Sequence, residues 1–159
     1  MRIDPAKHMK VAPWLILAAI LALTGCVTSP PSSADAAADA AAKKFQPPAG
    51  KANLYIARAH DNLGNALRFK LSLDGSALGT IAQGNYYLVS IEPGAHHIEV
   101  DYLLSAEKAV VEAKAGKNYF FEVTATSGGS GTKIGLSMVL LEEMGKLMVK
   151  QDKIAPKAK

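Results

Sequence analysis

The stretch ALRFKLSLDG, residues 66–75, decides the fold class. The residues on one side of it are all apolar: Leu67, Phe69, Leu71 and Leu73. Between them lie arginine, lysine and serine, and this strict alternation is typical of a half-buried β-strand. The Asp-Gly pair that ends the stretch is a strong hairpin signal, because both residues tolerate a positive φ. The stretch therefore predicts a strand that leads directly into a tight turn.

Similar patterns continue on both sides of this stretch. We expect strands over residues 53–59, 66–73, 76–81, 86–91, 96–102, 108–113, 118–126 and 134–140. Turn signals separate them, among them Gly84-Asn85, Pro93-Gly94 and Gly116-Lys117. About eight short strands with turns every 8–12 residues predict an all-β fold, an antiparallel β-sandwich. Residues 142–150 fit a short helix as well as a strand, so the pattern leaves their structure open.

A different pattern precedes the domain. The run Leu23-Thr24-Gly25-Cys26 follows an uncharged apolar stretch, residues 11–23, with Lys10 immediately before it. The stretch is too short to cross a bilayer, which takes about 20 apolar residues, but it fits the apolar region of a secretory signal. The run resembles the lipobox of bacterial lipoproteins. The resemblance implies that residues 1–25 are a signal peptide and that the Cys26 thiol is lipidated. A plain signal peptide and an uncleaved anchor are the alternatives, and Met9 is as acceptable a start as Met1.

Charge and cysteine content limit the classes of function. The formal net charge of the chain is +4, and it falls to +2 when residues 1–25 are removed. The remaining positive charge gathers near the end of the chain and forms no stripe on a recognisable binding element, so we expect no nucleic-acid partner. No cysteine follows Cys26, so the domain has no disulfide. The residue after Cys26 is Val27. An aspartate at that position tends to retain lipoproteins in the inner membrane, so its absence favours attachment to the outer membrane, with the domain facing the periplasm.

The chain divides into four parts. After the signal, residues 26–50 are rich in Ala, Pro and Ser, and such composition predicts a flexible tether below the lipidated cysteine. As a coil, these residues span about 27 Å, enough to hold the domain away from the lipid. Residues 51–150 form the β-sandwich domain, and residues 151–159 form a basic tail.

The order of the turn motifs resembles that of DUF2846, a family of bacterial lipoproteins of unknown function. The motifs are Leu54-Tyr55-Ile56-Ala57-Arg58, Leu73-Asp74-Gly75, Gly79, Gly84-Asn85-Tyr86-Tyr87, Pro93-Gly94-Ala95-His96 and Ala115-Gly116-Lys117-Asn118-Tyr119. The central motifs are also similar to those of PEGA-type surface modules, which are small β-sandwiches. The resemblance covers most of residues 51–145. It implies a fold and an envelope location, and it implies no reaction.

The residues that carry chemistry do not converge in the sequence. His96 and His97 are adjacent on one predicted strand and so point to opposite faces, which argues against a shared metal. Ser90, His96 and Asp101 have the residue types of a hydrolytic triad, but no G-x-S-x-G motif exposes a serine. We therefore expect no catalytic residues, no metal site and no cofactor.

Arg58, Tyr86 and Tyr87 are the candidate binding surface. Tyrosine is also enriched in strands, so a role in the core is the alternative for each. We expect a non-enzymatic, membrane-anchored module whose partners are the bilayer, through Cys26, and envelope proteins or peptidoglycan. The alternative is a domain that binds a small ligand or a glycan through loops and exposed tyrosines. A concave pocket lined by convergent polar groups would favour the ligand, and an open edge strand would favour a protein partner.

Overall fold

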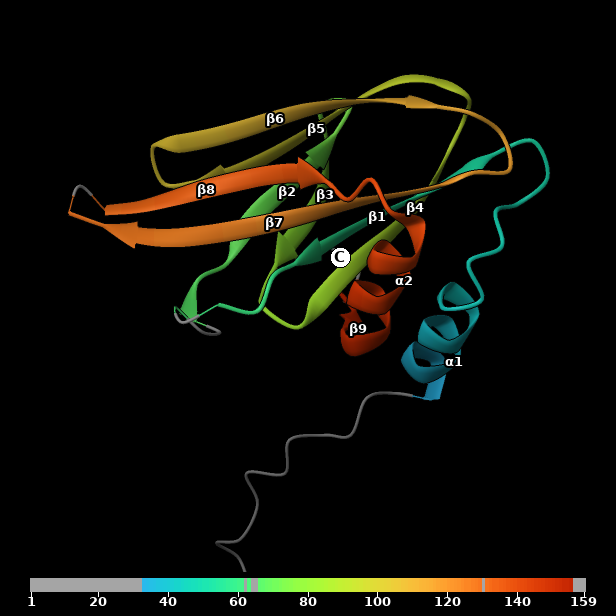
Figure 1. The fold of residues 1–159 in the computed structure, drawn as a ribbon, viewed down its shortest axis with the longest axis horizontal. Helices are drawn as coiled ribbons and strands as arrows, with labels where there is room; N and C mark the ends of the chain where they lie inside the picture. The colour runs from blue at the N-terminus through green and yellow to red at the C-terminus, as the bar shows by residue number, and fades with distance from the viewer. Residues whose placement is uncertain (1–32, 62, 64–65, 130, 156–159) are drawn as a thin grey trace, which may run out of the picture. The chain divides into compact units, whose positions relative to one another are not determined.

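The computed structural model describes residues 33–61, 63, 66–129 and 131–155 (Figure 1). The predicted signal peptide and Cys26 lie outside the described residues. The elements are α1 (Ser33–Ala42), β1 (Ala52–Arg58), β2 (Phe69–Leu73), β3 (Ser76–Ile81), β4 (Asn85–Ile91), β5 (Gly94–Tyr102), β6 (Ser105–Ala113), β7 (Asn118–Gly128), β8 (Gly131–Met138), α2 (Glu142–Gln151) and β9 (Lys153–Ile154). The predicted strands are all present, with ends that shift by a few residues.

Two sheets pack face to face and confirm the predicted all-β sandwich. One sheet has five strands in the order β8-β7-β1-β4-β9, and the other has four in the order β3-β2-β5-β6. Most neighbours are antiparallel, as expected, but β1 pairs with β7 and β4 pairs with β9 in parallel. The first sheet is therefore mixed, which the local patterns did not indicate.

Strand β2 buries the residues that the alternating pattern predicts to be buried. Phe69, Leu71 and Leu73 are buried, whereas Lys70 is exposed. The turn that follows places Asp74 at φ 50° and Gly75 at φ 76°, the left-handed conformation that an Asp-Gly hairpin requires. This hairpin sets the register of β2 against β3.

The main core lies between the two sheets. It is built from apolar side chains of both, including Leu54 and Ile56 of β1 and Ile98 and Val100 of β5. All seven residues of β1 are buried, because β1 is the central strand of its sheet and both of its faces are covered.

A layer of two helices covers the outer face of the five-stranded sheet (Figure 1). A second apolar cluster lies beneath them, with Tyr55, Tyr86 and Phe120 from the sheet and Val149 from α2. Gly145 of α2 lies so close to the sheet that a Cβ atom there would be 2.3 Å from the Phe120 ring. The helices thus exclude solvent from the outer face of the sheet over this cluster, whereas the end of β7 and much of β8 remain exposed.

Two boundaries predicted from composition were wrong. Residues 33–50 are not a free tether, because α1 packs on the sheet and the Tyr55 hydroxyl donates a hydrogen bond of 2.7 Å to the Ala42 carbonyl. The tail also begins later than residue 151, since β9 pairs with β4 and Ala155 is buried. The open question about residues 142–150 is answered: they form α2.

Candidate functional site

Strand β4 is only partly covered along its outer side. β1 pairs with it over Tyr86–Ile91 on the inner side, whereas β9 pairs only with Asn85 and Tyr86. The last described contact of that pairing is the bond from the Ala155 N–H to the Tyr86 carbonyl, at 2.7 Å. Within the described part of the chain, β4 beyond Tyr86 is therefore an open sheet edge.

The register shows which backbone groups this edge presents. Tyr86 directs its carbonyl toward β9, away from β1. Backbone groups alternate in direction along a strand, so the N–H and C=O groups of Leu88 and Ser90 also point away from β1. On β1, Leu88 is paired with Tyr55 and Ser90 is paired with Asn53. The edge thus offers two donors and two acceptors in the spacing that an extended chain matches.

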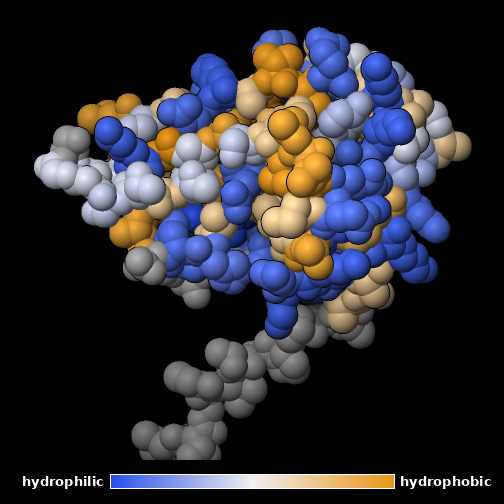
Figure 2. Space-filling model, in the orientation of Figure 1, coloured by the Kyte–Doolittle hydropathy of each residue, from blue (hydrophilic) through white to orange (hydrophobic). Residues whose placement is uncertain are grey.

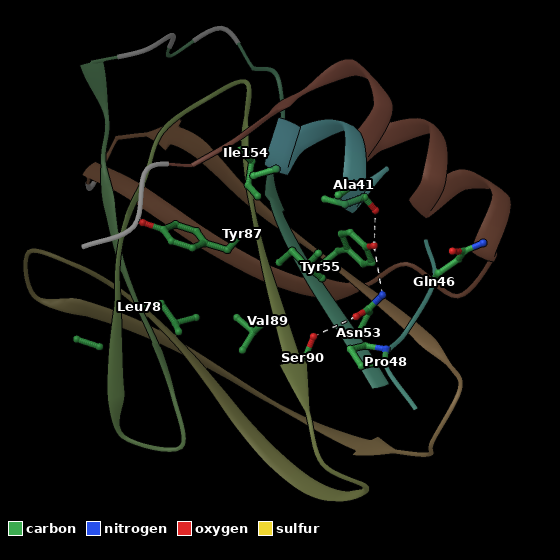
Figure 3. A pocket seen from close by; sticks show the side chains of 14 residues that line it. Ala41, Gln46, Pro48, Asn53, Tyr55, Leu78, Tyr87, Val89, Ser90 and Ile154 are labelled. Carbon is green, nitrogen blue, oxygen red and sulfur yellow. Dashed lines mark hydrogen bonds between the residues drawn. The ribbon is translucent and has the colours of Figure 1, made fainter. Parts of the chain in front are cut away.

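The open edge forms the floor of a groove, which we call the edge groove. Its volume is about 730 Å³. One wall is β3 and the other is α1 with the segment that follows it; the lining residues are Ala38, Ala41, Ala42, Gln46, Pro48, Asn53, Tyr55, Ala77, Leu78, Tyr87, Leu88, Val89, Ser90 and Ile154. Figure 3 shows Leu78, Tyr87 and Val89 on one side of β4 and Asn53, Tyr55 and Ser90 on the other. The groove is mainly apolar and runs along the side of β4 that, among the described residues, has no strand partner beyond Tyr86.

Three polar side chains of the groove, Asn53, Tyr55 and Ser90, bond to one another. The Ser90 hydroxyl donates to Asn53 Oδ1 at 3.4 Å, and Asn53 Nδ2 contacts the Tyr55 hydroxyl at 3.5 Å (Figure 3). Asn53 Nδ2 also donates to Asn118 Oδ1 at 3.2 Å. Burial raises the pKa of Tyr55 to about 12, so its hydroxyl stays protonated and donates to Ala42 at neutral pH. These groups hold the wall in place, and the polar surface that the groove leaves open consists of the β4 backbone and the exposed Gln46 side chain.

Asp39 fixes α1 as the second wall. Its Oδ1 accepts hydrogen bonds from the Tyr86 hydroxyl at 2.8 Å and from the Ile154 N–H at 3.0 Å. Its Oδ2 pairs with Lys43 at 2.8 Å, on the next turn of the helix. Burial alone would raise the pKa of Asp39, but these bonds outweigh it and hold the pKa below its usual 3.8. The carboxylate is therefore ionised at neutral pH and holds α1 against both β4 and β9.

The predicted binding surface of Arg58, Tyr86 and Tyr87 is wrong as an exposed surface, because all three are buried. The Arg58 guanidinium lies between the sheets, 4.9 Å from the centre of the Phe69 ring, and pairs with Asp61. Tyr86 is covered by α1. Only Tyr87 contributes to the edge groove, and its hydroxyl donates to the Thr80 carbonyl at 3.2 Å.

The candidate triad residues and histidines have separate structural partners. Ser90 bonds to Asn53 in one sheet, whereas His96, in the other, bonds through Nδ1 to Asp74 at 2.7 Å and through Nε2 to the Glu92 carbonyl at 2.8 Å. His60 bonds to Asp152 at 2.8 Å, and burial raises the pKa of that carboxyl. Among the described residues, no three histidines, cysteines or carboxylates gather into a group able to hold a metal ion.

Sequence reasoning missed Asp39 and Asn53, which build this site, and it considered Ser90 only as a residue of a hydrolytic triad. Asn53 carried one usable signal, since it is a polar residue within a run that is otherwise apolar and buried. Asp39 lies in an alanine-rich segment whose composition indicated disorder. No local pattern places Asp39 opposite Tyr86, 47 residues away.

Comparison with known proteins places the chain in a family. A family model described as a protein of unknown function, DUF2846, matches residues 48–135, more than half of the chain. The chain belongs to the DUF2846 family. The DUF2846 match runs from just before β1 into β8, so α1, α2 and β9 lie outside it.

The chain also matches an uncharacterized protein of Haemophilus influenzae. The two are 31% identical over 106 residues, which is 66% of this chain and 61% of the relative. The DUF2846 chain thus spans about three fifths of that relative's length. No helix among the described residues is long and apolar enough to cross a membrane.

Proposed function

We propose that this DUF2846 protein is a lipid-anchored, non-enzymatic module of the bacterial envelope that binds an extended segment of a partner polypeptide along β4. The observation that carries the proposal is the edge of β4 at the floor of the edge groove, which no strand covers beyond Tyr86 in the part of the chain that the structure describes. Natural proteins usually cover or disrupt exposed strand edges, because an unpaired strand recruits other strands. An edge that is left open beside an apolar groove is suited to strand addition, in which the partner's main chain supplies affinity and the groove supplies specificity.

The shape and chemistry of the groove support a polypeptide more than a small polar ligand. Leu88 and Ser90 present alternate backbone groups, which a peptide satisfies and a glycan does not match in spacing. The groove side chains that a glycan would need, Asn53 and Tyr55, already bond within the protein. Tyr86 and Tyr87, which the ligand hypothesis expected to be exposed, are buried.

The anchor half of the proposal is supported by the sequence. The Leu-Thr-Gly-Cys run ends an apolar stretch of the right length for a secretory signal, and Val27 favours the outer membrane with the domain in the periplasm. A covalent lipid holds a protein at a bilayer without a spanning helix. Envelope proteins and peptidoglycan-associated proteins are then the partners within reach.

The anchor is tested by Cys26→Ser. We expect the variant to leave the membrane fraction and to lose the mass of its acyl chains, because the thiol is the acylation site. A processed variant that still sediments with membranes would refute lipid anchoring.

The binding half is tested by photocrosslinking in living cells. Benzoylphenylalanine replaces Ala77, an exposed residue on the β3 wall of the groove, and in a control replaces Val110, an exposed residue of β6. We expect a discrete crosslinked polypeptide from position 77 that position 110 does not give. Equal patterns from the two positions would contradict binding in the groove.

A further inference from the structure

The outer surface of α2 carries an apolar ridge. It consists of four side chains that remain 51–86% exposed: Leu140, Leu141, Met144 and Leu147. Leu141, Met144 and Leu147 are spaced three residues apart, which places them along one side of the helix, and Leu140 lies just before its entry. Figure 2 shows hydrophobic atoms gathered over α2 and surrounded by hydrophilic ones. A contiguous apolar surface of this kind marks an interaction site.

The chain that leads to α1 determines what can lie near this surface. Only residues 27–32 separate Cys26 from Ser33, where α1 begins. Seven peptide steps reach about 25 Å at full extension. The folded part has a radius of gyration of about 14 Å, so this reach is shorter than its diameter. Because α1 is docked rather than free, a lipid on Cys26 keeps the helical side of the fold near the bilayer.

The ridge and α1 belong to the same side of the fold. α1, α2 and the segment between α1 and β1 all cover the outer face of the five-stranded sheet (Figure 1). The Lys150 ammonium of α2 lies 6.0 Å from the centre of the Phe45 ring, just after α1. Asn118 bonds to both the Phe45 carbonyl and Glu142 of α2.

The charges on this side favour an anionic surface. Three of the four acidic residues of the two helices pair with lysines: Asp39 with Lys43, and Glu142 and Glu143 with Lys146. The fourth, Asp35 of α1, is also engaged in an interaction. The exposed ammonium groups of Lys44, Lys150 and Lys153 have no carboxylate within 4.0 Å among the described residues. Basic groups beside an apolar strip are the combination that binds anionic lipid.

We propose that the α2 ridge, with Lys44, Lys150 and Lys153 around it, rests on the surface of an anionic bilayer. The inference rests on the proposed anchoring through Cys26 and adds the orientation that the anchor permits. The docked helices lie against the lipid, while the four-stranded sheet faces away from it. The domain then lies on the membrane instead of floating at the end of a tether.

Site-specific quenching tests this orientation in the full lipidated chain. Leu147→Cys and Val110→Cys are matched probes, since the two native side chains are 51% and 53% exposed, on α2 and on β6 respectively. Acylation blocks the Cys26 thiol, so each variant carries one free thiol for a bimane label. The proteins are reconstituted in vesicles of phosphatidylethanolamine and phosphatidylglycerol that contain doxyl-labelled lipid, and flotation verifies attachment.

We expect doxyl lipid to quench the label at position 147 several-fold more strongly than the label at position 110. Replacing Lys150 and Lys153 with glutamate should weaken the quenching at position 147 while the protein still floats with the vesicles. Equal quenching at the two positions in floating protein overturns the orientation and leaves the anchor intact. A label at position 147 that is shielded from aqueous iodide but is not quenched by doxyl lipid also overturns the orientation, because it shows that protein, and not lipid, covers the ridge. Failure to float overturns both the anchor and the orientation.

Discussion

The Tyr86 hydroxyl donates a hydrogen bond of 2.8 Å to Asp39 Oδ1, across 47 residues of sequence. The bond joins the helix that approaches from the N-terminal side to the strand whose open edge forms the floor of the groove. Burial, first of all, and the adjacent Asp39 carboxylate raise the pKa of Tyr86 far above 10, so the hydroxyl remains a donor. Together with the bonds from Ile154 to Asp39 and from Tyr55 to Ala42, this bond holds a low-complexity segment in place as a wall of the candidate site.

Tyr86→Phe removes that bond and should loosen α1. We expect the free energy of unfolding to fall by about 1.5–3 kcal/mol, the range for a hydrogen bond to a charged group. Trypsin cleavage after Lys43 and Lys44 should accelerate as well. Tyr102→Phe is the control, because Tyr102 has no hydroxyl partner among the described residues, and it should change neither quantity. Unaltered cleavage in Tyr86→Phe would mean that the bond between Tyr86 and Asp39 does not hold the helix.

The pair of His96 and Asp74 predicts a pH dependence of stability. His96 donates from both ring nitrogens to acceptors, and the bond to Asp74 raises its pKa above 6.5 while lowering that of Asp74 below 3.8. A histidine whose pKa is higher in the folded state than in the unfolded chain stabilises the fold in full at pH values below its unfolded pKa. This stabilisation is lost as the pH rises through its folded pKa. An aspartate whose pKa is lower in the folded state stabilises the fold at pH values above its unfolded pKa. This stabilisation is lost as the pH falls through its folded pKa.

The contribution of this pair is thus greatest between about pH 4.5 and 6. Urea denaturation at pH 5.5 and 8.5 should show a loss at the higher pH of up to about 1 kcal/mol for this partly exposed pair. In His96→Gln that loss should shrink, and in the exposed His97→Gln it should persist. An unchanged pH dependence in His96→Gln would show that the pair does not titrate as described.

Gly145→Ala should destabilise the protein although alanine is the better helix former. The gain in helix propensity is about 1 kcal/mol. The added Cβ would lie 2.3 Å from the Phe120 ring, and overpacking of this kind costs about 1–3 kcal/mol. Gly129→Ala, in open space, is the control and should be nearly neutral. A more stable Gly145→Ala protein would indicate that α2 sits farther from the sheet.

Leu71→Ala tests the burial of the inner face of β2. Leu71 is 2% exposed between the sheets, so its truncation should lower the free energy of unfolding by about 2–5 kcal/mol. Lys70→Ala, one residue earlier on the exposed face, should change it by less than about 0.5 kcal/mol. Similar effects for the two variants would mean that the faces of β2 are assigned wrongly.

The sandwich was predictable because its strands carry local signals. β2 and β5 alternate, and Asp74-Gly75 fixes a turn that few other residue pairs permit. The parallel pairing of β1 with β7 was not predictable, since no local pattern encodes which strands become neighbours. The two-residue strand β9 is too short to leave a pattern.

The helical layer explains why the candidate site was mispredicted. Tyr86 and Tyr87 point to opposite faces of their sheet, so Tyr86 would be exposed if solvent reached the outer face. α1 and α2 cover that face, and both tyrosines are buried. The sequence of α1 is mostly alanine, which indicates helix propensity but gives no sign of what the helix packs against. Gly145, a glycine inside a helix, was the one local sign of close packing.

The most direct test of the central claim compares Ser90→Pro with Ser90→Ala in the Ala77 crosslinking strain. Proline removes the outward N–H of Ser90 without breaking the pairing of β4 with β1, as edge positions tolerate it. Alanine removes only the hydroxyl and its bond to Asn53. We predict that Ser90→Ala retains the crosslinked polypeptide and that Ser90→Pro, folded and with wild-type membrane attachment, loses it. Equal crosslinking in the two variants would contradict strand addition at β4.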